Sequence, residues 1–251
     1  MSFYNQQEQQ QQYHGGIELG PPVAQSSLEA RSKFIERTYI HLAGAIAGFV
    51  AIEAALLSST TVKSFAIDVL SRGQMGWLIV LGLFMVVSWV ADKWARSATS
   101  LPLQYAGLAL YVVAEAVIFV PLLMIAQMLS GPENPIIFTA GVSTMAIFAA
   151  LTGIVLYTKK DFSWMRGALS IAGLAAMGLI VASLVFGFSL GIFFTVAMIA
   201  FAACYILYDT SNILHHYRTD QYVAASLGLF ASVALLFWYV VRLLIALSGR
   251  D

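Results

Sequence analysis

Two ionisable residues near the C-terminus lie within or beside long apolar segments. Asp209 ends one apolar run, and Arg242 lies deep within the next. An ionisable group so close to hydrocarbon costs free energy, and such residues are usually kept for an ion pathway, a pairing or a switch. Asp209 is therefore the first candidate functional residue, and Arg242 is a supporting one.

Glu115 and Glu53 are further carboxyl groups in apolar segments. Glu115 lies well inside its segment, and a lone buried carboxyl group protonates more readily than it stays charged. It is either a neutral hydrogen-bond donor between helices or part of an ion route. Glu53 lies nearer an outer end and could simply reach water. If both side chains face the interior of the bundle, they could form an acidic path towards Asp209. Unchanged ion flux after substitution of Glu53 and Glu115 by glutamine would exclude this path.

His41 and Asn212 are supporting polar candidates. His41 follows Arg37 by one helical turn, and histidine titrates near neutral pH, although a hydrogen-bonded role at the membrane surface is the favoured interpretation. Asn212 follows Asp209 by three residues, so the two could share a hydrogen bond as an alternative to a functional role for Asp209.

No metal site or cofactor is expected. His215 and His216 are near Asp209 and Asp220, but adjacent histidines point to different sides of a helix and no HExxH pattern is present. Cys204 is the single cysteine, which excludes disulfides within the chain.

The elements that must position these residues are membrane helices. Hydrophobic residues make up 60% of the 251 residues and charged residues 10%, against about 25% charge in a soluble domain. Apolar runs of about 20 residues can each cross the hydrocarbon core as a helix. We predict an all-α polytopic protein with seven spans, at residues 38–58, 75–95, 103–129, 136–157, 167–187, 189–209 and 222–247.

Residues 1–35 differ from the rest because they are polar and glutamine-rich. Such a segment cannot bury enough apolar surface to offset its ordering entropy, so we predict a disordered tail followed by a seven-helix domain at 36–251. The tail does not have the pattern of a cleaved signal peptide.

Lysine and arginine residues in the connections predict the orientation. A cytoplasmic N-terminus gives the cytoplasmic side nine of them and the other side four. The nine are Arg31, Lys33, Arg37, Lys93, Arg96, Lys159, Lys160, Arg166 and Arg218, and the four are Lys63, Arg72, Arg242 and Arg250. Seven full spans place the C-terminus outside, whereas a re-entrant last segment would return it to the cytoplasm.

Several functional classes are disfavoured. No GxSxG or HExxH element is present, so we do not expect an enzyme. The last span has no lysine for a retinal Schiff base. Thirteen acidic and thirteen basic residues balance, so net charge gives no reason to expect a nucleic-acid partner. The lipid bilayer is the expected environment.

Several segments of the chain resemble motifs of a known family. The segment YILYDTSNI (205–213), the later YVAASLGLF, and KKDFS (159–163) at the exit of the fourth span are similar to motifs of the Bax inhibitor-1 family of transmembrane proteins. The resemblance covers about residues 34–247. It implies seven helices packed around a central last helix, roles in cytoprotection and stress response, and a pH-sensitive calcium leak.

The resemblance also implies functional residues. The family's mechanism uses two aspartates on the last two spans, which share a proton because two close carboxylates cannot both ionise cheaply. Asp209 matches the first aspartate, but Ser232 occupies the place of the second. A serine can hydrogen bond to Asp209 but cannot share its negative charge. Arg96 matches the basic residue that the family places near the first aspartate, and it could instead be a surface anchor.

Two hypotheses therefore remain open. One is a proton-modulated cation leak in a bacterial inner membrane, with calcium as the permeant ion and no cofactor. The other is a membrane regulator that binds a protein partner, such as a membrane-bound quality-control protease, through the N-terminal tail. Deleting residues 1–30 should abolish the regulator's effect and leave a leak largely intact.

Overall fold

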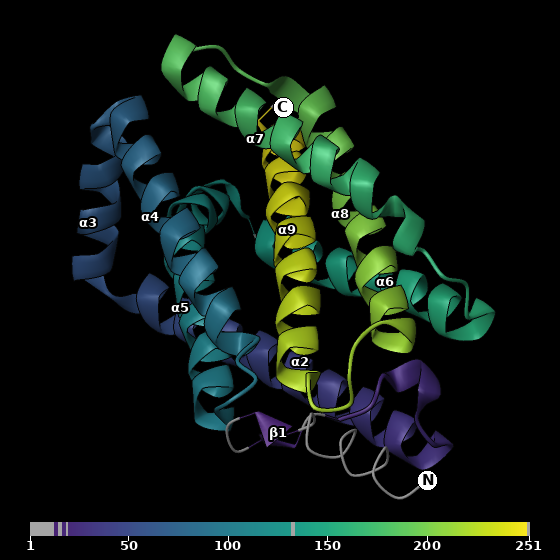
Figure 1. Cartoon of the computed structure of the whole chain (residues 1–251). Helices are drawn as coiled ribbons and strands as arrows, with labels where there is room; N and C mark the ends of the chain where they lie inside the picture. Colours follow the sequence, from purple (N-terminus) through teal and green to yellow (C-terminus); the bar gives the residue numbers. More distant parts are fainter. Residues whose placement is uncertain (1–12, 15–16, 19, 132–133, 250–251) are drawn as a thin grey trace, which may run out of the picture.

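The computed structural model describes residues 13–14, 17–18, 20–131 and 134–249, and most of them are helical (Figure 1). The elements in chain order are β1 (Tyr13–His14), β2 (Ile17–Glu18), η1 (Val23–Gln25), α2 (Leu28–Ser58), α3 (Thr60–Ser71), α4 (Gly73–Ala95), α5 (Leu101–Leu129), α6 (Ile136–Thr158), η2 (Ser163–Met165), α7 (Arg166–Phe186), α8 (Gly191–His215) and α9 (Tyr222–Ser248). The strands β1 and β2 form a short antiparallel pair, in which Tyr13 lies opposite Glu18.

The helical class and the seven predicted spans are confirmed. Helices α2 and α4 to α9 are long and apolar enough to cross a membrane. Local sequence explains several of their ends. The Ser100 hydroxyl accepts a hydrogen bond from the Leu103 amide at the start of α5. Lys159 and Gly187, the residues directly after α6 and α7, are both in the left-handed conformation that closes many helices.

Three elements differ from the predictions. Helix α8 ends at His215 rather than at residue 209, so Asp209 lies within the helix and not at its end. Helix α2 begins at Leu28 rather than near residue 38, because the Ser27 hydroxyl accepts a hydrogen bond from the Ala30 amide and caps it. This start also moves the predicted boundary of the N-terminal tail from residue 35 to about residue 27; much of the tail lies outside the described residues. Helix α3 was not predicted, since its twelve residues include Lys63 and Asp68 and form no long apolar run.

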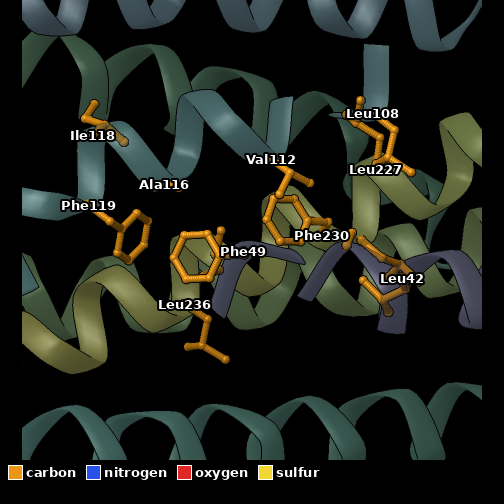
Figure 2. Packing of buried hydrophobic residues seen from close by; sticks show 14 of the residues in the cluster. Leu42, Phe49, Leu108, Val112, Ala116, Ile118, Phe119, Leu227, Phe230 and Leu236 are labelled. Carbon is orange, nitrogen blue, oxygen red and sulfur yellow. The ribbon is translucent and has the colours of Figure 1, made fainter. Parts of the chain in front are cut away.

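Helix α9 is the centre of the bundle. It contacts α2, α4, α5, α6 and α8, and Figure 1 shows it between the α4–α5 pair and α8. Side chains from α2, α5 and α9 form the core drawn in Figure 2. There the Phe49 ring packs edge-on against Phe119 and Phe230, with ring centroids 5.1 Å and 6.0 Å apart. The predicted packing around a central last helix is thus confirmed.

Helix α9 spans the full height of the bundle. The side-chain amide of Asn134, two residues before α6, donates a hydrogen bond of 3.0 Å to the hydroxyl of Ser248 at the end of α9. The end of α9 and the α5–α6 turn therefore lie on the same side of the molecule. This contact favours a complete seventh span over the re-entrant alternative.

The segment before α2 packs onto the α8–α9 loop (residues 216–221). The Val23 amide donates to the Tyr217 carbonyl at 2.9 Å, and the Thr219 amide donates to the Pro21 carbonyl at 3.1 Å. The Val23 side chain is fully buried. The loop that precedes the central helix is therefore held by the N-terminal segment.

Candidate functional site

A cavity of about 1250 Å³ lies among α4, α5, α7, α8 and α9. Residues of α9 line it from Leu227 to Ala246, a length of about 28 Å at 1.5 Å per helical residue. Asp209, Ser232 and Arg96 lie at one end of the cavity, which we call the Asp209 end, and Arg242 lies towards the other. Its length is close to the roughly 30 Å of a bilayer's hydrocarbon core.

Asp209 and Ser232 face each other across α8 and α9. The Ser232 hydroxyl donates a hydrogen bond of 2.5 Å to Asp209 Oδ2, and Ser232 itself is buried. Gly228, one turn earlier on α9, lies beside this pair, and a Cβ atom there would make an ordinary contact of 4.0 Å with the Asp209 carboxyl carbon. The hydrogen bond expected between Ser232 and Asp209 is thus present in the structure.

Arg96 also lines the Asp209 end, but its direct partner is Asp92. The Arg96 Nε atom donates to both Asp92 carboxylate oxygens, at 2.8 Å and 2.9 Å. Burial raises the pKa of Tyr217 in the α8–α9 loop to about 12; the Arg96 guanidinium opposes this rise and the Asp209 carboxylate adds to it. Tyr217 thus lies near both charges, and Arg96 is an ion-pair partner of Asp92 beside Asp209.

The other two acidic candidates, Glu115 and Glu53, have different surroundings. Glu115 is buried on α5 and lines the cavity, as does Tyr111 one turn earlier on the same helix. Glu53 is also buried, but it is not among the cavity-lining residues, and neither of its carboxylate oxygens has a hydrogen-bond partner among the described residues. Glu53 therefore does not reach water, and the structure does not join it to a path through this cavity.

His41 lies in a hydrogen-bonded cluster rather than at the cavity. Its Nε2 atom is 3.0 Å from the Tyr105 hydroxyl, and its Nδ1 atom is 2.6 Å from the Arg37 carbonyl. The Tyr222 hydroxyl lies 3.3 Å from that of Tyr105. This arrangement agrees with the interfacial interpretation of His41.

Asn212 and Arg242 have different surroundings. The Asn212 carbonyl accepts hydrogen bonds from the His216 and Tyr217 amides and so ends α8. Asp209 has its hydrogen bond to Ser232 rather than to the Asn212 side chain. The Arg242 guanidinium lies 5.8 Å from the centroid of the Tyr239 ring, and both side chains line the cavity.

The KKDFS segment is tied to the end of α8. The Ser163 amide donates to Asp161 Oδ1 at 2.8 Å, and this hydrogen bond lowers the pKa of Asp161 to about 2; contacts with the Ser163 hydroxyl and His216 also lower it. His216 Nε2 lies 3.1 Å from Asp161 Oδ2. The Ser211 hydroxyl accepts from the Phe162 amide at 2.8 Å. These contacts link the α6–α7 connection to the turns that follow Asp209.

Several residues in or beside the cavity were missed in the sequence. Asp92 was not singled out in the sequence, although the i, i+4 spacing of opposite charges on one helix could have identified its pair with Arg96. Tyr217 and the aromatic lining gave no such signal, because hydropathy does not say which face of a membrane helix meets a cavity. The aromatic lining residues are Trp77, Phe84, Trp89, Tyr111, Phe119, Phe188, Tyr205, Tyr208, Trp238 and Tyr239.

Comparison with known proteins agrees with this architecture. The family described as "Inhibitor of apoptosis-promoting Bax1" matches residues 31–249, which is nearly the whole chain. The chain belongs to this family. The match confirms the resemblance seen in the motifs around Asp209 and at the KKDFS segment.

Three relatives illustrate the range of the family. Bax inhibitor 1 of Schizosaccharomyces pombe is 28% identical over 70% of this chain, and a protein of Pseudomonas aeruginosa is 29% identical over 46%. The chain spans 64% and 52% of the length of these two relatives. The Golgi anti-apoptotic protein of vaccinia virus (strain Lister) is 26% identical over 90% of both chains. The chain is thus an integral membrane protein with eukaryotic, viral and bacterial relatives.

Proposed function

We propose that this protein is a cation leak of a bacterial inner membrane, with calcium as the permeant ion and the N-terminus in the cytoplasm. The observation that carries the proposal is the place of Asp209, a carboxyl group beside a cavity that follows the central helix for about 28 Å. Carboxylate oxygens are the ligands that Ca2+ prefers. A cytoprotective role in stress would agree with the name of the vaccinia relative.

Protonation of Asp209 would modulate the leak. A protonated carboxyl group offers a cation no charge, so flux should fall as Asp209 takes up a proton. Because Ser232 is not a second acid, the two-carboxyl coupling that steepens a titration is absent from this pair. We therefore expect the pH dependence of a single group, spread over about two pH units.

Calcium flux into proteoliposomes between pH 6 and 8 tests this proposal. The wild type should conduct, Asp209→Asn should lose most of the flux, and Ser232→Asp should show a steeper pH dependence. Asp68→Asn is the matched control, because this exposed acid lies on α3 and pairs with Arg72 away from the cavity. It should conduct like the wild type.

Each other outcome decides between versions of the proposal. Flux only in Ser232→Asp would mean a pore that the serine disables. No flux in any folded variant, or equal flux in the wild type and Asp209→Asn, would reject the leak.

A partner-binding regulator is the second candidate, and the N-terminal segment favours it. Residues 21–23 pair with the loop that carries Tyr217, beside the Asp209 end of the cavity. A protein bound to the tail would therefore act close to this end. Deleting residues 1–18 keeps the pairing segment, so it should abolish a regulator's effect in cells while leaving calcium flux unchanged. If the deletion changes neither the effect in cells nor the calcium flux, residues 1–18 have no role in either function.

A further inference from the structure

The Asp209 end of the cavity carries unbalanced acidic groups. Asp92 and Arg96 neutralise each other as an ion pair. Asp209 and Glu115 line the same cavity, and neither has an ion-pair partner within 4.0 Å among the described residues. Arg242, the other basic lining residue, lies ten residues beyond Ser232 on α9, about 15 Å along the helix. A cation is therefore the complementary occupant.

The two acids lie at a similar depth. Helices α5 and α9 run parallel, and the rings of Tyr111 and Phe230 pack with centroids 6.1 Å apart. Glu115 lies one turn after Tyr111, and Ser232, which binds Asp209, lies two residues after Phe230. The two carboxyl groups therefore belong to neighbouring levels of the same cavity.

The rest of the cavity is suited to an apolar body. Aromatic side chains line it along its length, with Trp89, Tyr205 and Tyr208 on the helices that bear Asp92 and Asp209, and Trp77 and Trp238 further along. Aromatic rings attract organic cations through their faces as well as by apolar contact. The volume of about 1250 Å³ far exceeds the space that a metal ion needs. A mostly apolar pocket with a few convergent polar groups is the usual form of a small-molecule site.

We propose that this cavity binds an amphipathic organic cation, an apolar chain or ring system that carries one ammonium group. The ammonium group lies at the Asp209 end, where Glu115 is a second acid on the same cavity, and the apolar body extends along α9 past Trp238. This proposal does not rest on ion conduction, because it requires binding and not passage. An acyl chain without positive charge would leave both carboxyl groups unused, and an anionic amphiphile would be repelled by them.

Tryptophan quenching in lipid nanodiscs tests the proposal on the full chain. Trp94→Phe and Trp164→Phe remove two indoles outside the cavity and leave Trp77, Trp89 and Trp238 as reporters. The probe is 12-bromododecyltrimethylammonium, whose bromine quenches nearby indoles. Its matched controls are 12-bromododecanol and 12-bromododecyl sulfate, which share the chain and differ in charge.

Quenching by the cation should saturate, with an apparent Kd at least tenfold below that of the alcohol. Asp209→Asn should raise that Kd about tenfold, which corresponds to about 1.4 kcal/mol. Glu115→Gln should raise it by a smaller factor, since it tests the second acid alone. Asp209→Glu should restore most of the affinity, and Asp68→Asn should bind like the wild type.

Equal affinities for the three probes would overturn the proposal and show a cavity that takes any lipid-like chain. Preference for the sulfate would assign the cavity to anionic amphiphiles through its arginines. Unchanged cation affinity in both folded acid variants would also reject it. If Asp209→Asn does not fold, the probe comparison on the wild type and the Glu115→Gln variant still decides.

Discussion

The hydrogen bond between Ser232 and Asp209 should contribute measurably to stability, because it joins two helices and one partner is a carboxyl group. Hydrogen bonds to charged groups contribute about 1.5–3 kcal/mol. We expect Ser232→Ala to lower the free energy of unfolding by about that amount. Ser226→Ala is the matched control, since among the described residues that buried hydroxyl bonds only to the Val223 carbonyl of its own helix. The free energies of unfolding are measured by chemical denaturation in detergent. Equal losses in Ser232→Ala and Ser226→Ala would contradict a stabilising role for the hydrogen bond to Asp209.

Asp161 should support stability at neutral pH without acting as the pH sensor. Its pKa is lowered from 3.8 to about 2, so its contribution is fully present above about pH 4 and is lost as the pH falls through about 2. Asp161→Asn should therefore lower the melting temperature slightly at pH 7, since the group is half exposed and screened by solvent. The gap to the wild type should narrow below about pH 4 and close below about pH 2. A gap that instead widens there would refute the assignment.

Much of the residue pattern of the cavity could be predicted, since charged residues in apolar runs are conspicuous and the family resemblance added Ser232 and Arg96. Asp209, Ser232, Arg96, Glu115 and Arg242 all line the cavity. Glu53 does not line the cavity. Its position within a span predicts its depth in the membrane but not the face of the helix from which its side chain points. The roles of these residues in conduction stay predictions.

At the scale of helices, α4 and α5 approach each other closely at Gly107. A Cβ atom there would lie 2.5 Å from the Ala91 carbonyl oxygen and from the Ala95 amide, both of them backbone atoms. Gly107→Ala must therefore push the helices apart, and overpacking of this kind typically costs about 1–3 kcal/mol. We expect a lower melting temperature in nanodiscs.

Gly153→Ala on α6 provides the control for this helix contact. Nothing lies within 4 Å of its added Cβ, and alanine favours a helix over glycine by about 1 kcal/mol. It should melt at or above the wild-type temperature. A Gly107→Ala variant that melts like Gly153→Ala would show that α4 and α5 are not closely packed.

The long helices were predictable because each must supply about 20 apolar residues to cross a bilayer. The start of α2 was not, since its first turns carry Glu29, Arg31 and Lys33 and lie beyond the apolar run. Helix α3 was not predicted for the same reason, because it is short and partly polar. Where a helix is amphipathic rather than apolar, hydropathy alone does not reveal it.

The whole molecule should cross the membrane seven times, with the C-terminus opposite the cytoplasm. Cysteine variants on a Cys204→Ser background test this: Lys160→Cys lies on the predicted cytoplasmic side, and Gly131→Cys, in the α5–α6 turn near Ser248, on the other. An impermeant maleimide added to intact cells should label position 131 only. Labelling of position 160 instead would invert the orientation.

The cavity itself could not be predicted from the sequence. It is bounded by α4, α5, α7, α8 and α9, whose residues lie as far as 169 positions apart, from Trp77 to Ala246. Such a space depends on how the helices diverge, and every lining helix is equally apolar whether it faces lipid or a neighbour. The family match fixes the fold, but the chemistry at the Asp209 end depends on individual side chains.

The hydroxyl of Ser232 can act in either direction. It has one hydrogen and two lone pairs, so it donates to Asp209 while that group is ionised and can accept from it once it is protonated. Two facing carboxyl groups lack this freedom, because they bond well only while a single proton lies between them. The hydrogen bond between α8 and α9 is therefore kept in both protonation states of Asp209. Acid can remove the charge that faces the cavity while the packing of these two helices stays the same.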